Sequence, residues 1–393
     1  MKYVLLFIQL WALRVNLSAQ EAMYKIPVVV HVVHNGEEVG SGPNISYEQI
    51  ASQIEVLNED FRRTKGTNGF NEHPLGTDTQ IEFFLTPTDP EGKLLEEPGV
   101  DRVDGGRASW PKGNVRNPID RVLKPISIWD PGRFFNIWTV NFGGFVSRDL
   151  LGYAQFPEGS GLSGLPESGE DPTTDGIVVG YKYFGSSEKG SFPVLFAPFN
   201  LGRTTTHEVG HWLGLRHIWG DGACGVDDFC MDTPVSENPS FGCPAQKSTC
   251  GTADLFENYM DYTDDPCMNM FTRCQKERML TVLTSSPRRK ELFTKENINP
   301  PTSTLNSLME GIKLWPNPSS TGNFWLHIPL SLRVSSLDIY DLLGKRQLVE
   351  VDSKSYTDNK CVISLAKNKV GLYIVKLNFV DGRHYSTRIL IQP

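Results

Sequence analysis

Three histidines and one glutamate lie within eleven residues of the segment GRTTTHEVGHWLGLRHIWGDG (202–222), although the whole chain of 393 residues has only eight histidines. On a helix, His207 and His211 are one turn apart on the same face, so their imidazoles can reach one metal ion. Glu208 does not share that face, but its carboxylate can hold a water beside the metal. This is the arrangement of a general base.

A third histidine completes the pattern H-E-x-x-H-x-x-G-x-x-H. Gly214 can adopt a positive φ, end the helix and turn the chain so that His217 returns to the metal. Three protein nitrogens leave one coordination position for water, as in catalytic zinc sites. The alternative is a buried helix with unrelated histidines. The preceding threonines 204–206 are poor helix formers, so tertiary packing must hold the helix, and Asn200 is expected to cap it.

The composition indicates an ordinary globular protein with many loops. Hydrophobic residues make up 39% and charged residues 21% of the chain, and there are 36 glycines and 26 prolines. A net charge of -8 argues against nucleic acid or an anionic membrane as the main partner.

The elements that position the histidines form a mixed α/β layer. The apolar run Ile26–Val33 predicts a central strand buried on both faces. The segment 46–63 begins with a Ser46/Gln49 capping box and continues with helical periodicity. Further strands are expected at 81–89, 134–142 and 176–184, and a short edge strand at 150–159.

The two ends of the chain have other compositions. Residues 1–19 resemble a secretory signal peptide, with a strand as the alternative, and no other segment is long and apolar enough to span a membrane. Residues 20–296 are then the catalytic domain and residues 297–311 a linker. Residues 312–393 alternate apolar and polar positions, which predicts a small all-β sandwich. The overall class is α+β.

The catalytic segment resembles the metzincin zinc peptidases, and most closely their pappalysin family. The resemblance rests on HEVGHWLGLRHIWGDG, DTPV, NYMDY and CMNMFT, and also on IPVVVHVV and LGYAQFP, together covering most of residues 24–284. It implies zinc ligation by the three histidines, with Glu208 as base and acid, and a turn below the metal at Met260. Tyr262 would stabilise the oxyanion, unless it is a packing residue. A substrate strand would add to the edge segment Gly152, Tyr153, Ala154, Gln155 and Phe156.

Six of the seven cysteines fall within 51 residues. In an exported protein this indicates disulfides rather than a zinc site, because close C-x-x-C pairs are absent. The family pattern implies the bridges Cys224–Cys250 and Cys243–Cys267. A bridge between Cys230 and Cys274 follows only by elimination.

Acidic residues suggest two further roles. Calcium prefers hard oxygen donors, and similar family members bind calcium in this region, although a solvated acidic loop is the alternative. Asp264 and Asp265 lie where the family forms the pocket after the scissile bond, which implies cleavage before Arg or Lys. The calcium candidates are Asp227, Asp228, Asp232 and Thr233.

The C-terminal module resembles the sorting domain of the type IX secretion system of Gram-negative bacteria, through LWPNPSSTGNFWL, LDIYDLLGKRQ and GLYIVKLNF. The resemblance implies export through the periplasm, recognition by the outer-membrane machinery and a secreted or cell-surface location. The alternative is a carbohydrate- or protein-binding sandwich.

A secreted zinc endopeptidase acting on protein or peptide substrates is therefore the leading hypothesis. An adhesin on an inactive peptidase scaffold would not need Glu208. A hydrolase of non-peptide amides would share the zinc chemistry but not the Met-turn and the edge strand. Only residues 20–24 separate the signal from the first strand, so latency through a long pro-segment is not expected.

Overall fold

The computed structural model describes residues 23–111, 118–143, 150–293, 311–329, 332, 334–357, 360–365, 370–379 and 384–393. The predicted signal peptide, and the predicted linker apart from Gly311, lie outside the described residues. Among the helices of the described part, none is long and apolar enough to cross a membrane.

A twisted sheet in the order β2-β1-β5-β8-β7 forms the first layer, and β3 pairs with the far half of β1. All of its strand pairs are parallel except the pair of β7 with β8. The antiparallel β7 ends the sheet, as the sequence predicts for a short edge strand. The strands are β1 (Tyr24–His34), β2 (Ile81–Leu85), β3 (Val100–Asp104), β5 (Phe135–Val140), β7 (Gly152–Ala154) and β8 (Ile177–Gly180).

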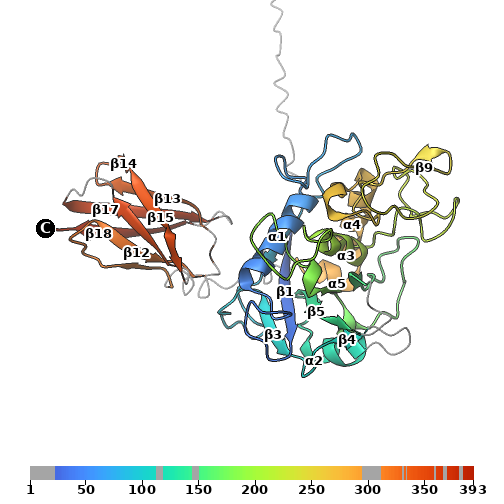
Figure 1. The fold of residues 1–393 in the computed structure, drawn as a ribbon, viewed down its shortest axis with the longest axis horizontal. Coiled ribbons are helices and arrows are strands. Elements are labelled where there is room, and N and C mark those ends of the chain that lie inside the picture. The colour runs from blue at the N-terminus through green and yellow to red at the C-terminus, as the bar shows by residue number, and fades with distance from the viewer. Residues whose placement is uncertain are drawn as a thin grey trace, which may run out of the picture.

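The sheet is covered on both faces, which explains the continuous apolar run of β1. Val28, Val30 and Val32 point into the main core, where α1 and α3 pack side by side (Figure 1). Val33 points to a smaller core beneath the segment η1 and α2. As predicted, Ser46 caps α1, accepting the backbone N–H of Gln49. The helices are α1 (Tyr47–Phe61), η1 (Ile119–Leu123), α2 (Lys124–Ser127), α3 (Arg203–Trp212), α4 (Arg273–Ser285) and α5 (Pro287–Glu291).

Short elements shape the loops around these layers. They are two small sheets, β4 (Trp110–Pro111) with β6 (Phe142–Gly143) and β9 (Ser248–Thr249) with β10 (Thr252–Ala253), and the single turns η2 (Pro172–Thr174), η3 (Tyr181–Tyr183) and η4 (Asp265–Cys267).

Two antiparallel four-stranded sheets form the C-terminal region, in the orders β11-β12-β16-β15 and β14-β13-β17-β18. They share one apolar core that includes Phe324, Val375 and the free thiol of Cys361. This confirms the predicted all-β module. Its strands are β11 (Lys313–Trp315), β12 (Asn323–His327), β13 (Val334–Asp341), β14 (Arg346–Gln347), β15 (Val349–Thr357), β16 (Lys360–Leu365), β17 (Gly371–Phe379) and β18 (His384–Ile391).

Candidate metal centre and active site

Helix α3 is held at its start by a distant aspartate. It begins at Arg203, and within the described residues no side chain caps it. The expected cap by Asn200 is wrong, because Gly202 occupies the N-cap position. The amide group of Asn200 donates to the hydroxyl of Ser187. The Asp265 carboxylate accepts the backbone N–H groups of Leu201 (2.7 Å) and Arg203 (3.3 Å). All ten residues of α3 are buried, so tertiary packing offsets the low helix propensity of its threonines.

The chain turns sharply after α3 at Gly214, as the sequence predicts. Its φ of 87° lies in the left-handed region, and the next N–H, that of Leu215, donates to the carbonyl of Gly210 at 2.9 Å. A Cβ at position 214 would also come within 2.7 Å of Val282. The turn sends the chain back along α3 and brings His217 beside the helix.

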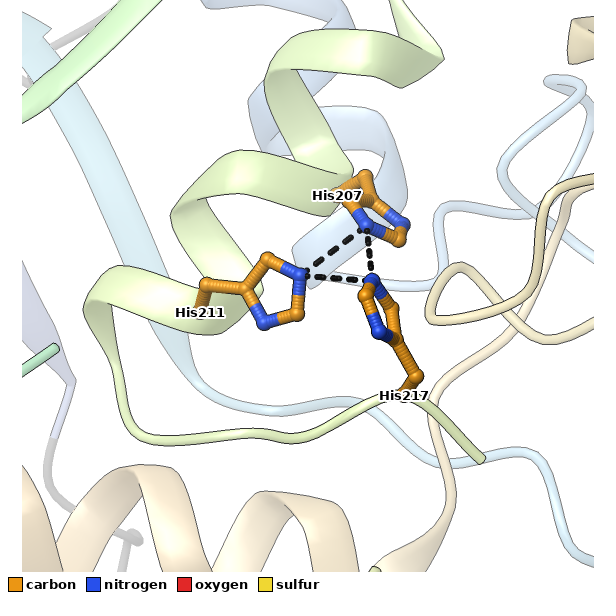
Figure 2. Close-up of side chains that lie close together, drawn as sticks. All are labelled: His207, His211 and His217. Atoms are coloured by element: carbon orange, nitrogen blue, oxygen red, sulfur yellow. Dashed lines mark hydrogen bonds between the residues drawn. The ribbon is translucent and has the colours of Figure 1, made fainter. Parts of the chain in front are cut away.

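The three histidines of the motif converge on one point (Figure 2). Their Nε2 atoms are 3.0 Å apart for His207 and His211, 3.1 Å for His211 and His217, and 3.3 Å for His207 and His217. Two of these rings come from α3 and the third from the loop that follows it (Figure 2).

The hydrogen bonds on the other side of each ring determine its tautomer. Each Nδ1 lies against an oxygen that has no proton to give, so each Nδ1 carries the hydrogen and donates it. All three Nε2 atoms then present lone pairs to one another, which only a cation between them stabilises. The acceptors are the backbone carbonyl of Tyr259 for His207 (2.7 Å), the carbonyl of Leu215 for His211 (2.8 Å) and the carboxylate of Asp221 for His217.

The donor set fits zinc. Burial and the neighbouring His211 lower the pKa of His207 well below its ordinary value. Burial and the neighbouring His217 lower the pKa of His211 to about 3. Both rings are therefore neutral, as metal ligation requires. Tetrahedral zinc with Zn–N bonds of about 2.05 Å places its nitrogen ligands about 3.3 Å apart, close to the observed separations.

Glu208 and Tyr262 both lie near this centre. A Cβ on Gly152 of β7 would come within 2.9 Å of the Glu208 Oε1 atom, so this strand position must remain glycine for the carboxylate to stay where it is. The Tyr262 ring is 5.5 Å from that of His207 and 4.8 Å from that of His217. Burial, with the charge of Glu208, raises the pKa of Tyr262 to about 12, so its hydroxyl keeps a proton that it can donate.

Met260 lies beneath the histidines in a firmly held turn. It is fully buried, and its sulfur lies directly over Gly210 of α3. Its backbone N–H donates to Asn258 (2.9 Å), whose side chain makes two hydrogen bonds with Gln275 of α4. The preceding Tyr259 supplies the carbonyl that holds His207. The turn thus fixes a histidine, and its methionine contributes apolar packing rather than a ligand.

The chain is similar to known proteins. A family profile described as Pregnancy-associated plasma protein-A matches residues 126–284. Extracellular metalloprotease 1 of Coccidioides posadasii is 39% identical over 261 residues, which are 66% of this chain and 76% of that protein. Mature mirolysin of Tannerella forsythia, solved with a cleaved peptide, is 39% identical with a TM-score of 0.58, covering 71% of this chain and 99% of the other. The chain belongs to the pappalysin family of metzincins.

This pappalysin is therefore a zinc metallopeptidase. A solved structure of mirolysin in complex with a small molecule named compound 9 matches with the same 39% identity and a TM-score of 0.59, covering 71% of this chain and all of the other. A second profile, described as a secretion system C-terminal sorting domain, matches residues 313–392. Together with its extracellular relatives, this makes the pappalysin a secreted or cell-surface protein.

Two side chains that the zinc-binding motif does not indicate support the third histidine. The ring of Trp219 stacks on that of His217, with centroids 4.3 Å apart and an interplanar angle of 5°. The Asp221 carboxylate accepts a hydrogen bond from Nδ1 of the same histidine and another from Arg216. Both residues lie directly after the motif, so the sequence HIWGDG could have indicated them. The pattern of zinc ligands alone does not include it.

The two acids predicted to line the substrate pocket, Asp264 and Asp265, differ in burial and in their hydrogen bonds. Asp265 is 2% exposed and holds the start of α3, so the expectation that it contacts substrate is wrong. Burial raises its pKa to about 6. Asp264 is half-buried, and its N–H donates to the carbonyl of Gly242 at 3.0 Å. Only Asp264 stays a candidate.

The residues proposed as calcium ligands form hydrogen bonds with different neighbouring groups. Asp228 accepts the hydroxyl of Thr233 at 2.8 Å and 2.9 Å. Asp232 accepts the hydroxyl of Thr272 at the start of α4 (2.7 Å). Asp227 accepts the backbone N–H two residues further on. Calcium binding therefore stays a prediction.

The cysteines agree with the family pattern in two pairs. The structure contains the disulfides Cys224–Cys250 and Cys243–Cys267. The third bridge is not formed, because Cys230 and Cys274 are free thiols. Their sulfur atoms lie within 4.8 Å of each other, but the Cys274 thiol is directed to the carbonyl of Phe229 (3.7 Å). The two cysteines left after the family pairs are assigned are therefore close together, but they are not bonded.

Proposed function

We propose that this pappalysin is a secreted endopeptidase in which His207, His211 and His217 hold the zinc ion and Glu208 acts as general base and acid. The observation that carries the proposal is the triangle of three Nε2 lone pairs, each fixed by a hydrogen bond at Nδ1. The intact carboxylate beside this triangle favours a working peptidase over an inactive binding scaffold.

The chain's own groups handle the protons of the reaction. Zinc at such a site polarises the scissile carbonyl and acidifies a water molecule. Glu208 accepts a proton as the water attacks and delivers it to the leaving amine. Tyr262 keeps its own proton and donates a hydrogen bond to the developing oxyanion. Glu208 is buried, which strengthens its electrostatic interactions.

The substrate pairs with the free edge of β7. The Leu151 carbonyl and the Gln155 N–H form hydrogen bonds on the β8 side of the strand. Backbone groups of successive residues point to alternate sides, so those of Gly152 and Ala154 point away from β8. An extended peptide would add there as an antiparallel strand. This places its backbone beside Glu208, whose carboxylate lies against Gly152.

The remaining proposals concern specificity, structural metal and export. Asp264 would favour Arg or Lys after the scissile bond. Calcium would bind near Asp228 and Thr233. Residues 20–296 would form the catalytic domain. Residues 312–393 would direct export through the outer-membrane machinery.

Digestion of peptides blocked at both ends tests the function and the edge strand together. The wild type is expected to cut internal bonds. Ala154→Pro removes the outward N–H without removing a ladder bond, so kcat/KM should fall about tenfold while zinc per chain stays unchanged. Ala154→Ser keeps the N–H and is the control. Equal losses of zinc and cleavage would rule out substrate pairing, and failure to cut any blocked peptide would rule out an endopeptidase.

A further inference from the structure

An exposed phenylalanine stands beside the candidate catalytic tyrosine. Phe241 is 72% exposed, and its ring centroid is 6.3 Å from that of Tyr262. Tyr262 in turn contacts the rings of His217 and Trp219, each at 4.8 Å. A series of aromatic rings therefore leads from the zinc ligand to the surface, where Tyr262 is 41% exposed and Phe241 is the more exposed of the two.

The loop that carries Phe241 is fixed to the segment of the Met-turn. On one side, the Ser240 N–H donates to the Asp261 carboxylate at 2.8 Å. On the other side, the carbonyl of Gly242 accepts the N–H of Asp264 at 3.0 Å. The disulfide Cys243–Cys267 then joins the same two segments covalently. The phenylalanine is thus held in a defined position relative to Tyr262.

The position of the ring limits which substrate residues can reach it. The two centroid separations from Phe241 through Tyr262 to His217 place Phe241 at most about 11 Å from the zinc ligand. An extended peptide advances about 3.3 Å per residue. A substrate residue that contacts Phe241 would therefore lie within about three residues of the scissile bond.

We propose that Phe241 is a specificity determinant that forms the apolar wall of a substrate subsite near the scissile bond. The substrate class is a peptide with a bulky apolar side chain at one position within three residues of the cleaved bond. Leaving a large apolar ring in water is unfavourable, and such a side chain removes both surfaces from water when it binds. The inference rests on the proposed peptidase function and goes beyond it.

Kinetics with paired peptides tests the proposal on the full chain. A blocked peptide library digested by the wild type first identifies the position with the apolar preference. Peptides that carry leucine or alanine at that position are then compared. Phe241→Ala is expected to lower kcat/KM about tenfold for the leucine peptide and to leave the alanine peptide nearly unchanged. Phe241→Leu should keep most of the preference.

A matched variant controls for the loss of any exposed phenylalanine. Phe196 is 59% exposed and belongs to a different loop, where its N–H donates to the carbonyl of Lys182. Phe196→Ala should not change the leucine-to-alanine ratio, and all variants should keep their zinc. A wild-type library without an apolar preference, or an unchanged ratio in Phe241→Ala, would overturn the inference alone. Absence of any cleavage by the wild type would overturn the proposed function as well.

Discussion

Glu208→Gln is expected to lower kcat/KM by roughly 10²- to 10⁴-fold, the range that general acid–base catalysis contributes. Glutamine keeps the size of the side chain beside Gly152 but cannot accept a proton from water. The Nδ1 hydrogen bonds that orient the three histidines do not involve Glu208. Zinc per chain should therefore stay at one. Steady-state kinetics with blocked peptides and elemental analysis of the same samples measure both quantities.

An exposed glutamate supplies the matched control for this variant. Glu277 lies on α4, where its side chain is 64% exposed and pairs with Arg273. Glu277→Gln removes one negative charge from the same domain without touching the site, so its activity should equal that of the wild type. A Glu208→Gln variant with normal activity would contradict the role of the base. Low activity together with lost zinc would show that Glu208 supports the metal instead.

Asp175→Asn is expected to destabilise the fold by about 3–5 kcal/mol, the cost of leaving a buried charge without its partner. Asp175 and Arg289 are each 1% exposed and lie 2.7 Å apart. Arg288 binds the same carboxylate. The other oxygen accepts the indole N–H of Trp212 (3.0 Å), the residue after the second histidine. Denaturant unfolding of both proteins measures the difference.

The pH dependence of this effect has a definite sign. Burial alone would raise the pKa of Asp175, but Arg289 and Arg288 outweigh burial and leave the pKa below its ordinary value. The carboxylate therefore stabilises the fold above the unfolded-state pKa near 4, and this contribution disappears as the pH falls through the lower folded pKa. The asparagine variant should lack this acid-dependent loss. The exposed Asp104, replaced by Asn, is the control, and a variant as stable as the wild type would refute the account.

The local features of the fold could be predicted because their causes are close in sequence. Burial on both faces of the sheet produces the unbroken apolar run of β1. The Ser46 cap lies three residues from the N–H that it accepts. Likewise, the convergence of the histidines follows from helical periodicity and one glycine turn. Such features need no knowledge of distant contacts.

The features that could not be predicted depend on contacts between distant segments. Asp265 looks like a surface acid in the sequence, yet it holds the start of a helix 62 residues earlier. Asn200 has the right residue type for a cap, but the helix begins two residues later, with Gly202 at the N-cap position. Cys230 and Cys274 are neighbours whose bonding depends on the direction of one thiol. Residue type and spacing do not contain this information.

X-ray absorption at the zinc edge of the purified protein tests the central claim most directly. Within the part of the chain that the structure describes, two groups of side chains bring their ligand atoms together: the three histidines, and the set Cys230, Asp232 and Cys274. We predict one zinc per chain surrounded by three imidazole nitrogens and one oxygen at about 2.0–2.1 Å. Sulfur neighbours at about 2.3 Å, or fewer than three imidazoles, would contradict the account.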